Sequence, residues 1–387
     1  MIPLRLMLIC GEPSGDQLGA QLMVALKHLD PQVEISGVGG EAMAAQGLSS
    51  LFSLSDTAVM GLREVVPKIP KILARVNEAV DFAVRTRPDA VVLIDSPDFT
   101  HRIARKLKRR APEIATVNYV APQVWASRAY RARAMARYFD LVLALLPFEP
   151  QFFQSYGLKT VFVGHPAIER AARMQGGAAL RARLGIPTEA RLLCVLPGSR
   201  SNEVRLLLPV FREAVALLEQ RTANLYCVLP TIPHVAERVR RGAADWPTPL
   251  VILEREDDKF AAFAAADAAL AASGTVTTEL ALARTPLVVG YKLGWLTYKL
   301  ARPFIHAPFA TLVNILLERE AVPERIQEQC TPKALVEALL PLLEEGPPRA
   351  RQISDLGEAC RKLGEGSLAP SERAAQSLLE FAATRKT

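Results

Sequence analysis

Two carboxylates follow a strongly apolar run and are the first candidates for chemistry. The run Ala90–Ile94 reads AVVLI, and Asp95-Ser96-Pro97-Asp98 follows it directly. Sites of parallel α/β sheets form at the carboxyl ends of strands, where a partly buried carboxylate can act as a general base. One of the two can instead cap the next helix. We assign the base to Asp95 and the cap to Asp98, and residue types alone leave the reverse assignment open.

A second loop has the composition of a phosphate site. Gly198, Ser199 and Arg200 lie between the apolar run Leu192–Leu196 and a helical pattern. Such a loop offers backbone N–H groups, a helix N-terminus and a forked cation to an anion. An ordinary helix cap is the alternative interpretation.

A third loop repeats this arrangement. Ser273, Gly274 and Thr275 follow the Ala-rich run 268–271, and Glu279 comes one turn later. Small residues let a diphosphate approach the backbone, and a carboxylate at that place can accept hydrogen bonds from a ribose diol. Each loop alone can be a cap, but the two together favour a nucleotide diphosphate.

Two more loops follow predicted strands. Gly11–Asp16 (GEPSGD) opens a helix, with Ser14 and Asp16 as either ligand contacts or caps. Tyr119–Trp125 (YVAPQVW) contains Gln123 between aromatic residues, which suits either sugar recognition or plain loop packing. The chain lacks G-x-S-x-G and G-x-G-x-x-G, which disfavours serine hydrolysis and dinucleotide binding. Its five histidines show no metal-ligand spacing, so we expect neither a metal nor a cofactor.

The elements that position these loops alternate between strands and helices. Apolar runs without polar alternation, separated by helical patterns, indicate parallel sheets covered on both faces. The pattern starts twice, so we predict an α/β protein of two Rossmann-like doubly wound domains facing a cleft. We expect domains at 1–168 and 169–350, with C-terminal helices at 351–387 that pack back on the first domain.

Composition sets the class of protein. The chain has 387 residues, of which 50% are hydrophobic and 22% are charged, which excludes a disordered chain and leaves material for two cores. The net charge of +7 favours anionic partners. Five widely spaced cysteines indicate reduced thiols in a cytoplasmic protein, and the N-terminal segment resembles a first strand more than a signal peptide.

Residues 65–80 form a basic amphipathic pattern. Val66, Ile69, Ile72, Leu73 and Val76 recur at helical spacing beside lysine and arginine. Such a helix can lie in the headgroup region of a membrane, or it can pack on a sheet. A dense basic zone at 101–137 also indicates proximity to phosphate or anionic lipid, although solvated helix faces explain part of it.

Ten motifs in one order resemble the lipid-A-disaccharide synthase family. They are GEPSGD, GVGG, the stretch Val59–Val65, IDSPDF, YVAPQVWA, LPFEP, VGHP, LPGSR with its glutamate, ASGT with its TE, and VVGYK. The resemblance covers residues 4–345 and implies a GT-B fold with the donor nucleotide in the C-terminal domain. It implies transfer of 2,3-diacylglucosamine from UDP to 2,3-diacylglucosamine 1-phosphate, with inversion and without a metal. The products it implies are a β-1,6-linked disaccharide 1-phosphate and UDP.

The resemblance also implies roles for residues. Asp95 becomes the base on the acceptor 6-hydroxyl, and the acceptor side of the cleft is lined by Ser14, Gly15, Asp16, Asp98 and Gln123. The UDP side comprises Gly198, Ser199, Arg200, Ser273, Gly274, Thr275, Glu279 and Asn314. Because both substrates carry acyl chains, the enzyme must reach the cytoplasmic leaflet of the inner membrane as a peripheral protein.

Two departures from the family pattern concern the sugar contacts. Ser127 follows YVAPQVWA where the family often has a second tryptophan, and Leu312-Val313 precedes Asn314 where Leu-Pro is usual. The alternatives are another UDP-sugar enzyme of this architecture, such as a lipid glycosyltransferase or a UDP-N-acetylglucosamine epimerase, and a nucleic-acid-binding protein. The last is disfavoured because the basic zone has no interleaved stacking residues.

Overall fold

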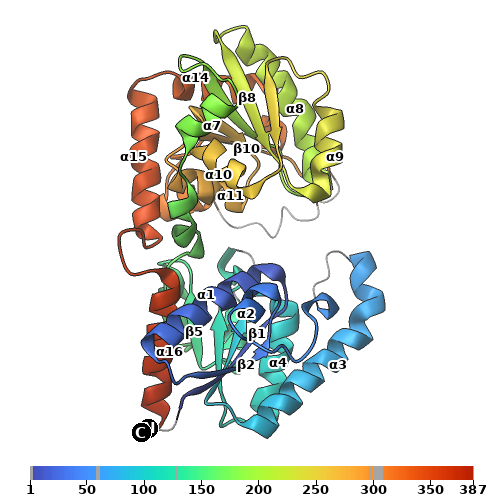
Figure 1. Ribbon diagram of the computed structural model, residues 1–387, viewed down its shortest axis with the longest axis vertical. Helices are drawn as coiled ribbons and strands as arrows, with labels where there is room; N and C mark the ends of the chain where they lie inside the picture. The colour runs from blue at the N-terminus through green and yellow to red at the C-terminus, as the bar shows by residue number, and fades with distance from the viewer. Residues whose placement is uncertain (1–2, 58–61, 127–129, 296–297, 300–307, 387) are drawn as a thin grey trace. The chain divides into compact units, whose positions relative to one another are not determined.

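The computed structural model describes residues 3–57, 62–126, 130–295, 298–299 and 308–386. The chain divides into two units, each built on a parallel sheet (Figure 1). Unit 1 holds residues 1–166 and 366–387, and unit 2 holds residues 167–365. The C-terminal segment expected at 351–387 divides between them, because α15 (Pro347–Lys362) lies in unit 2 and α16 (Pro370–Lys386) lies in unit 1.

The sheet of unit 1 has the strand order β2-β1-β3-β4-β5-β6. Its strands are β1 (Arg5–Cys10), β2 (Glu34–Val38), β3 (Ala90–Ile94), β4 (Ala115–Tyr119), β5 (Leu141–Ala144) and β6 (Thr160–Phe162). Its other helices are α1 (Pro13–Leu29), α2 (Glu41–Ala45), α3 (Leu62–Thr86), α4 (Pro97–Arg110), α5 (Tyr130–Met135) and α6 (Glu149–Gln154). Short 3₁₀ segments are η1 (Leu54–Asp56), η2 (Val124–Ala126) and η3 (Pro166–Arg173), the last beginning at the end of the unit.

Successive residues of β1 point into two different cores, as a strand covered on both faces requires. Leu6 and Leu8 pack in a cluster with residues of α1 and α16. Met7 and Ile9 pack in a second cluster with residues of α3 and α4. The C-terminal helix α16 therefore completes the core of the N-terminal unit, next to α1 (Figure 1).

The sheet of unit 2 has the order β12-β11-β10-β7-β8-β9. Its strands are β7 (Arg191–Leu196), β8 (Leu225–Pro230), β9 (Leu250–Leu253), β10 (Ala268–Ala271), β11 (Leu287–Tyr291) and β12 (Glu324–Ile326). Its helices besides α15 are α7 (Gly177–Arg183), α8 (Ser201–Glu219), α9 (Pro233–Gly242), α10 (Glu256–Ala265), α11 (Thr275–Leu282), α13 (Leu312–Leu317) and α14 (Pro332–Leu343), with the 3₁₀ segment η5 (Gln327–Gln329).

Both sheets place the candidate loops on neighbouring strands. In unit 1, β1 pairs with β3, and Cys10 lies opposite Ile94. In unit 2, β7 pairs with β10, and Leu196 lies opposite Ala271. Parallel strands end at the same edge of a sheet, so each unit brings two of its predicted loops together at one edge.

Candidate functional site

The β1–α1 and β3–α4 loops meet in unit 1 through a direct hydrogen bond. The Ser14 hydroxyl donates to Asp95 Oδ2 at 3.1 Å. Asp95 is partly exposed, so its other oxygen lone pairs are open to a substrate hydroxyl. The predicted base and the predicted acceptor-side serine therefore lie in one cluster.

The backbone at this edge of the sheet is strained. Asp95 and Ser96 have φ of +53° and +45°, and Val120, after the neighbouring strand β4, has φ of +75°. Left-handed conformations are rare outside glycine, above all for a β-branched valine, and such strain clusters at functional sites. In this turn directly after β3, the Asp95 carboxylate meets the Ser14 hydroxyl.

A second carboxyl lies close to this base. Burial, together with the charge of Asp95, raises the pKa of Glu12 above its usual range. Sequence reasoning did not single out Glu12, although it stands within the GEPSGD motif.

Gly15 and Asp16 have internal roles, which corrects the expectation that they line the acceptor side. The buried Asp16 carboxylate accepts hydrogen bonds from the backbone N–H groups of Gly40, Ala42 and Met43, so it caps α2. A Cβ on Gly15 would lie 2.9 Å from the Cβ of Cys10. That glycine allows α1 to pack closely on the sheet.

Asp98 does not cap α4, contrary to the expected role. The residue that precedes the helix is Ser96, and no side chain forms a cap hydrogen bond there. The Asp98 side chain is exposed and lines a recess of about 340 Å³ together with Glu12 and Arg102. Its assignment to the acceptor side stays a prediction.

The same recess is lined by part of the predicted membrane face of α3. Ile69 and Leu73 are each 43% exposed, and with Ile72 they form one wall. Val76, in contrast, is buried in the core, which corrects its assignment to a membrane contact. The side chain of Val66 lies outside the described residues.

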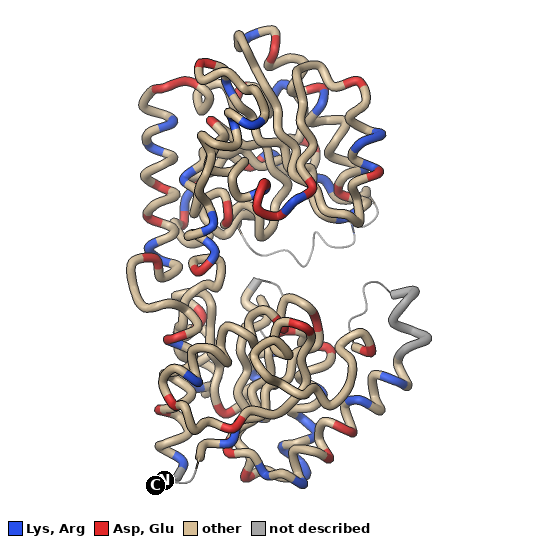
Figure 2. Tube along the Cα trace, viewed as in Figure 1, with Lys and Arg blue, Asp and Glu red and all other residues tan. Residues whose placement is uncertain are grey.

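Most cations near this face already have partners. Arg75 and Lys71 both bind the Asp56 carboxylate, which lowers the pKa of Asp56 through those hydrogen bonds. Within the basic zone, Lys108 binds Asp140, and Arg110 binds Asp81. Both signs of charge therefore occur along α3 (Figure 2), and two cations of the basic zone, Lys108 and Arg110, have acidic partners.

A buried glutamate supports the aromatic loop after β4. Glu149 Oε1 accepts a hydrogen bond from Trp125 Nε1 at 3.2 Å, and Oε2 accepts from the N–H groups of Leu145 and Leu146. The YVAPQVWA and LPFEP motifs thus meet in one contact. Gln123, two residues earlier, is exposed and free to reach a ligand.

Burial raises the pKa of Glu149 to about 7, although three hydrogen bonds oppose the shift. The folded protein then binds this proton more tightly than the unfolded chain, so the associated stability is present below about pH 4.5 and is lost as the pH rises through 7.

We expect the free energy of unfolding to fall by about 3 kcal/mol between pH 4.5 and pH 7, and Glu149→Gln to remove this dependence on pH. Urea denaturation at pH 5 and pH 7.5 measures it. Glu34→Gln, at an exposed carboxyl on β2, should keep the slope. An unchanged slope in Glu149→Gln would contradict the assignment.

Unit 2 contains a pocket of about 300 Å³ at the ends of β7, β8 and β10. It is lined by seven of the eight predicted UDP-side residues, namely Gly198, Ser199, Arg200, Ser273, Gly274, Thr275 and Glu279. Two of these are glycines with φ of +111° and +152°, at positions 198 and 274, where a side chain would be strained. The pocket also contains Thr231, whose buried hydroxyl has no partner among the described residues.

Glu203 organises the first loop of this pocket. Its Oε2 accepts from the N–H groups of Ser199 and Arg200, and its Oε1 binds the Arg200 guanidinium at 2.9 Å. The backbone N–H groups of Ser199 and Arg200 therefore already donate to Glu203, whereas the sequence predicted that they would be available to a phosphate. The Arg200 side chain is 78% exposed, which leaves most of its N–H groups for an anion.

Glu279 is only 3% exposed and lies between two cations. Arg170 contacts Oε1 at 3.2 Å, and Lys259 contacts Oε2 at 2.7 Å. A buried carboxylate is costly without such partners, and here the two contacts also fix the direction of the side chain. Sequence reasoning missed Lys259, which lines the pocket, because nothing local in Glu256–Ala265 connects it to a glutamate twenty residues later.

Asn314 does not line the pocket, which corrects its assignment to direct UDP binding. Its side chain has no exposed surface, and its amide makes four hydrogen bonds within the chain. Among the described residues there is also no cluster of His, Cys, Asp or Glu arranged to hold a metal ion. In the same part of the chain, no helix has the length and apolarity to cross a membrane.

Two α/β units, each built on a sheet of parallel strands with polar loops at the ends of adjacent strands, define a protein of the GT-B type. Solved structures agree: a putative UDP-N-acetylglucosamine 2-epimerase from Listeria monocytogenes matches with a TM-score of 0.69 at 14% identity, covering 100% of this chain and 98% of that one. Acinetobacter baumannii MurG matches with a TM-score of 0.57 at 16% identity, covering 98% and 100%. The family model for lipid-A-disaccharide synthetase matches residues 6–377, and the chain belongs to that family.

Curated relatives extend over the whole chain. The lipid-A-disaccharide synthase of Rhodospirillum centenum is 46% identical over 386 residues, covering 100% of this chain and 96% of the relative. That of Paramagnetospirillum magneticum is 47% identical over 377 residues, covering 97% and 96%. The protein is thus a glycosyltransferase of lipid A biosynthesis, as the motifs indicated. The epimerase alternative is not favoured, because the epimerase structures share the fold at low identity.

Proposed function

We propose that this glycosyltransferase condenses UDP-2,3-diacylglucosamine with 2,3-diacylglucosamine 1-phosphate. The products are the β-1,6-linked disaccharide 1-phosphate and UDP. Full-length identity of 46% to a relative named for this synthesis is the observation that carries the proposal. The polar pocket of unit 2 and the Ser14–Asp95 cluster of unit 1 supply the groups that such a reaction needs.

On the donor side, Arg200 neutralises the diphosphate and Glu279 accepts hydrogen bonds from the ribose. Lys259 and Arg170 hold the Glu279 carboxylate in position. Charge grows on the diphosphate as the bond to the sugar breaks, so an exposed guanidinium contributes more in the transition state than in the ground state. The unpartnered Thr231 hydroxyl gives the nucleotide one more polar contact.

On the acceptor side, Asp95 takes the proton of the 6-hydroxyl. The freed oxygen forms a bond to the anomeric carbon, the carbon–oxygen bond to UDP breaks, and UDP departs with that electron pair. Attack opposite to the leaving group inverts the configuration and gives the β-linkage. The Ser14 hydroxyl donates to Asp95 and holds its carboxylate in one orientation.

The direct test is incubation with both substrates, followed by mass analysis of the lipid product. Formation of a disaccharide monophosphate and UDP, also in EDTA, is the expected result. Appearance of an epimerised UDP-sugar with no disaccharide would refute the proposal. The same assay with acceptor omitted separates transfer from hydrolysis of the donor.

We further propose that the protein works as a peripheral protein at the cytoplasmic face of the inner membrane, with Ile69 and Leu73 in contact with lipid. Both are exposed aliphatic residues beside the recess that contains Asp98. Apolar area on a helix partitions into the headgroup region in proportion to the area buried there.

Replacing Ile69 and Leu73 with serine should lower binding to lipid vesicles by about tenfold or more and raise the KM of both lipid substrates. Vesicle flotation and steady-state kinetics measure the two effects. Val24→Ser with Leu29→Ser is the matched control, since these are exposed aliphatic residues of α1 away from the recess. Normal vesicle binding by the folded Ile69/Leu73 variant would exclude this contact.

A further inference from the structure

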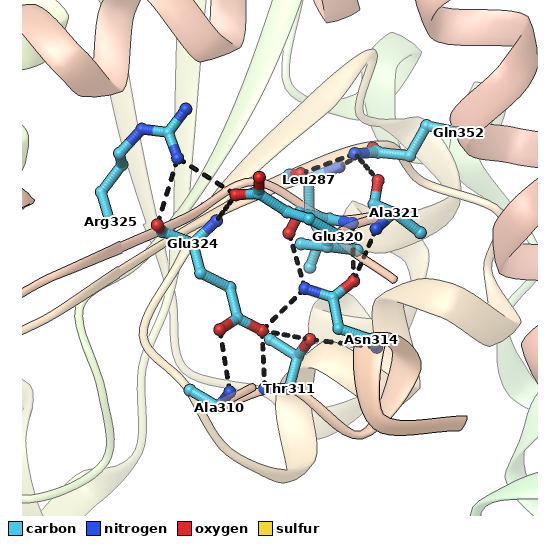
Figure 3. A network of polar contacts seen from close by, with 10 residues as sticks. Leu287, Ala310, Thr311, Asn314, Glu320, Ala321, Glu324, Arg325 and Gln352 are labelled. Carbon is cyan, nitrogen blue, oxygen red and sulfur yellow. Dashed lines mark hydrogen bonds and ion pairs between the residues drawn. The ribbon is translucent and has the colours of Figure 1, made fainter. Parts of the chain in front are cut away.

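One carboxylate outside the pocket of unit 2, that of Glu324, lies in a network of hydrogen bonds with Ala310, Thr311 and Asn314 (Figure 3). A further hydrogen bond joins Ala310 to Ser273 of the pocket. Glu324, the first residue of the edge strand β12, accepts from the N–H of Ala310 at Oε2. At Oε1 it accepts from the N–H and the hydroxyl of Thr311 and from Asn314 Nδ2. These four contacts are 2.7 to 2.8 Å long.

All four partners of this carboxylate are donors. An ionised carboxylate only accepts hydrogen bonds, so it fits such a place, whereas a carboxamide would turn an N–H group toward another N–H group. Glu324 is thus chemically specified, and it fixes the Ala310–Thr311 turn that leads into α13 (Figure 3).

The Ala310–Thr311 turn also contacts the donor pocket. The Ser273 hydroxyl donates to the carbonyl oxygen of Ala310 at 3.0 Å. Ser273 lines the pocket, directly before Gly274 and the start of α11. Because its proton is used on Ala310, Ser273 connects the pocket loop to the turn.

Asn314 holds the other side of the same turn. Its Oδ1 accepts from the N–H groups of Ala321 and Val322, and its Nδ2 also donates to the carbonyl of Val322. The segment that leads into β12 is therefore tied to α13 (Figure 3). Asn314 therefore connects to the pocket only indirectly, through Glu324 and the Ala310–Thr311 turn.

We propose that Glu324 is a positioning residue for the donor: through Ala310 it holds Ser273 and so keeps the Ser273–Thr275 loop in the conformation that binds the diphosphate. This inference rests on the proposed function, since it takes UDP as the ligand of the pocket. A loop that is already ordered before the donor binds costs the donor no ordering free energy. Removing the Glu324 contacts should therefore lower the affinity for the donor.

Glu324→Gln should weaken UDP binding by about tenfold and raise the donor KM by a similar factor, because the glutamine oxygen can replace only one carboxylate oxygen, so either Ala310 or the Thr311 and Asn314 donors lose their acceptor. The acceptor KM should stay unchanged. Calorimetry with UDP and kinetics with each substrate varied measure this. The matched control is Glu320→Gln, whose carboxylate accepts from the Glu324 N–H and from Arg325 in the same network but does not touch the turn. It should bind UDP as the wild type does.

A double-mutant cycle tests the route. If Glu324 acts through Ser273, the variant with both Glu324→Gln and Ser273→Ala should bind UDP no more weakly than the weaker single variant. The inference would be overturned if the loss of UDP affinity in the double variant equalled the product of the two single losses. Normal UDP binding by folded Glu324→Gln would also overturn it. If Glu324→Gln fails to fold, Glu324→Asp decides, since its carboxylate is one methylene shorter and withdraws from the Ala310 N–H. Weaker UDP binding supports the route, and unchanged binding refutes it. The wild type is assayed first, so a wild type that makes no disaccharide refutes the proposed function instead.

Discussion

Asp95→Asn should lower kcat by about 10² to 10⁴ while UDP affinity stays within about twofold of the wild type. An asparagine oxygen can still accept from Ser14, so the cluster keeps its geometry and loses only its proton acceptor. Single-turnover kinetics and UDP calorimetry on the same preparation separate the two effects.

Asp98→Asn is the matched control for this change. Asp98 lies three residues later, is exposed and lines the recess, but it has no hydrogen bond from Ser14. We expect at most a rise in the acceptor KM. If Asp98→Asn instead loses turnover and Asp95→Asn keeps it, the assignment of the base is reversed.

Arg200→Ala should lower kcat/KM by about 10² to 10³ and weaken UDP binding less than it slows turnover. The guanidinium is mostly exposed and anchored by one bond to Glu203, so it is held near the pocket with free donors. Donor analogues with a better leaving group should recover part of the lost rate, because less charge then needs stabilisation.

Arg205→Ala is the control for net charge, since Arg205 is exposed on the same helix α8 but does not line the donor pocket. It should change kcat/KM by less than about threefold. Equal losses of kcat/KM in the two variants would mean that the overall positive charge of this surface, and not the Arg200 guanidinium itself, stabilises the diphosphate.

The predicted acceptor side shows why local reading has limits. The GEPSGD motif predicts a functional turn, yet the types of its residues do not separate ligand contacts from caps. In the structure, the Ser14 hydroxyl donates to Asp95, and Asp16 accepts from three backbone N–H groups of a segment more than twenty residues away. Only the pairing of β1 with β2 and β3 brings those partners within reach.

The predicted membrane helix shows the same limit. Helical spacing groups Ile69, Leu73 and Val76 on one stripe, but the stripe is wider than the part that stays exposed. Because the sheet covers the second half of α3, Val76 enters the core. Periodicity reports amphipathicity and does not report what covers the apolar face.

The sequence by itself determined the two α/β units, the loops that end their strands and the family, because buried parallel strands and phosphate loops have local signatures. The tertiary structure alone decided which polar residues have free groups. Lys259 and Arg170 reach Glu279, Glu149 reaches Trp125, and Glu324 reaches Ala310, each across a separation with no sequence signal. A buried carboxylate takes whichever donors the packing brings to it, and that choice is made in three dimensions.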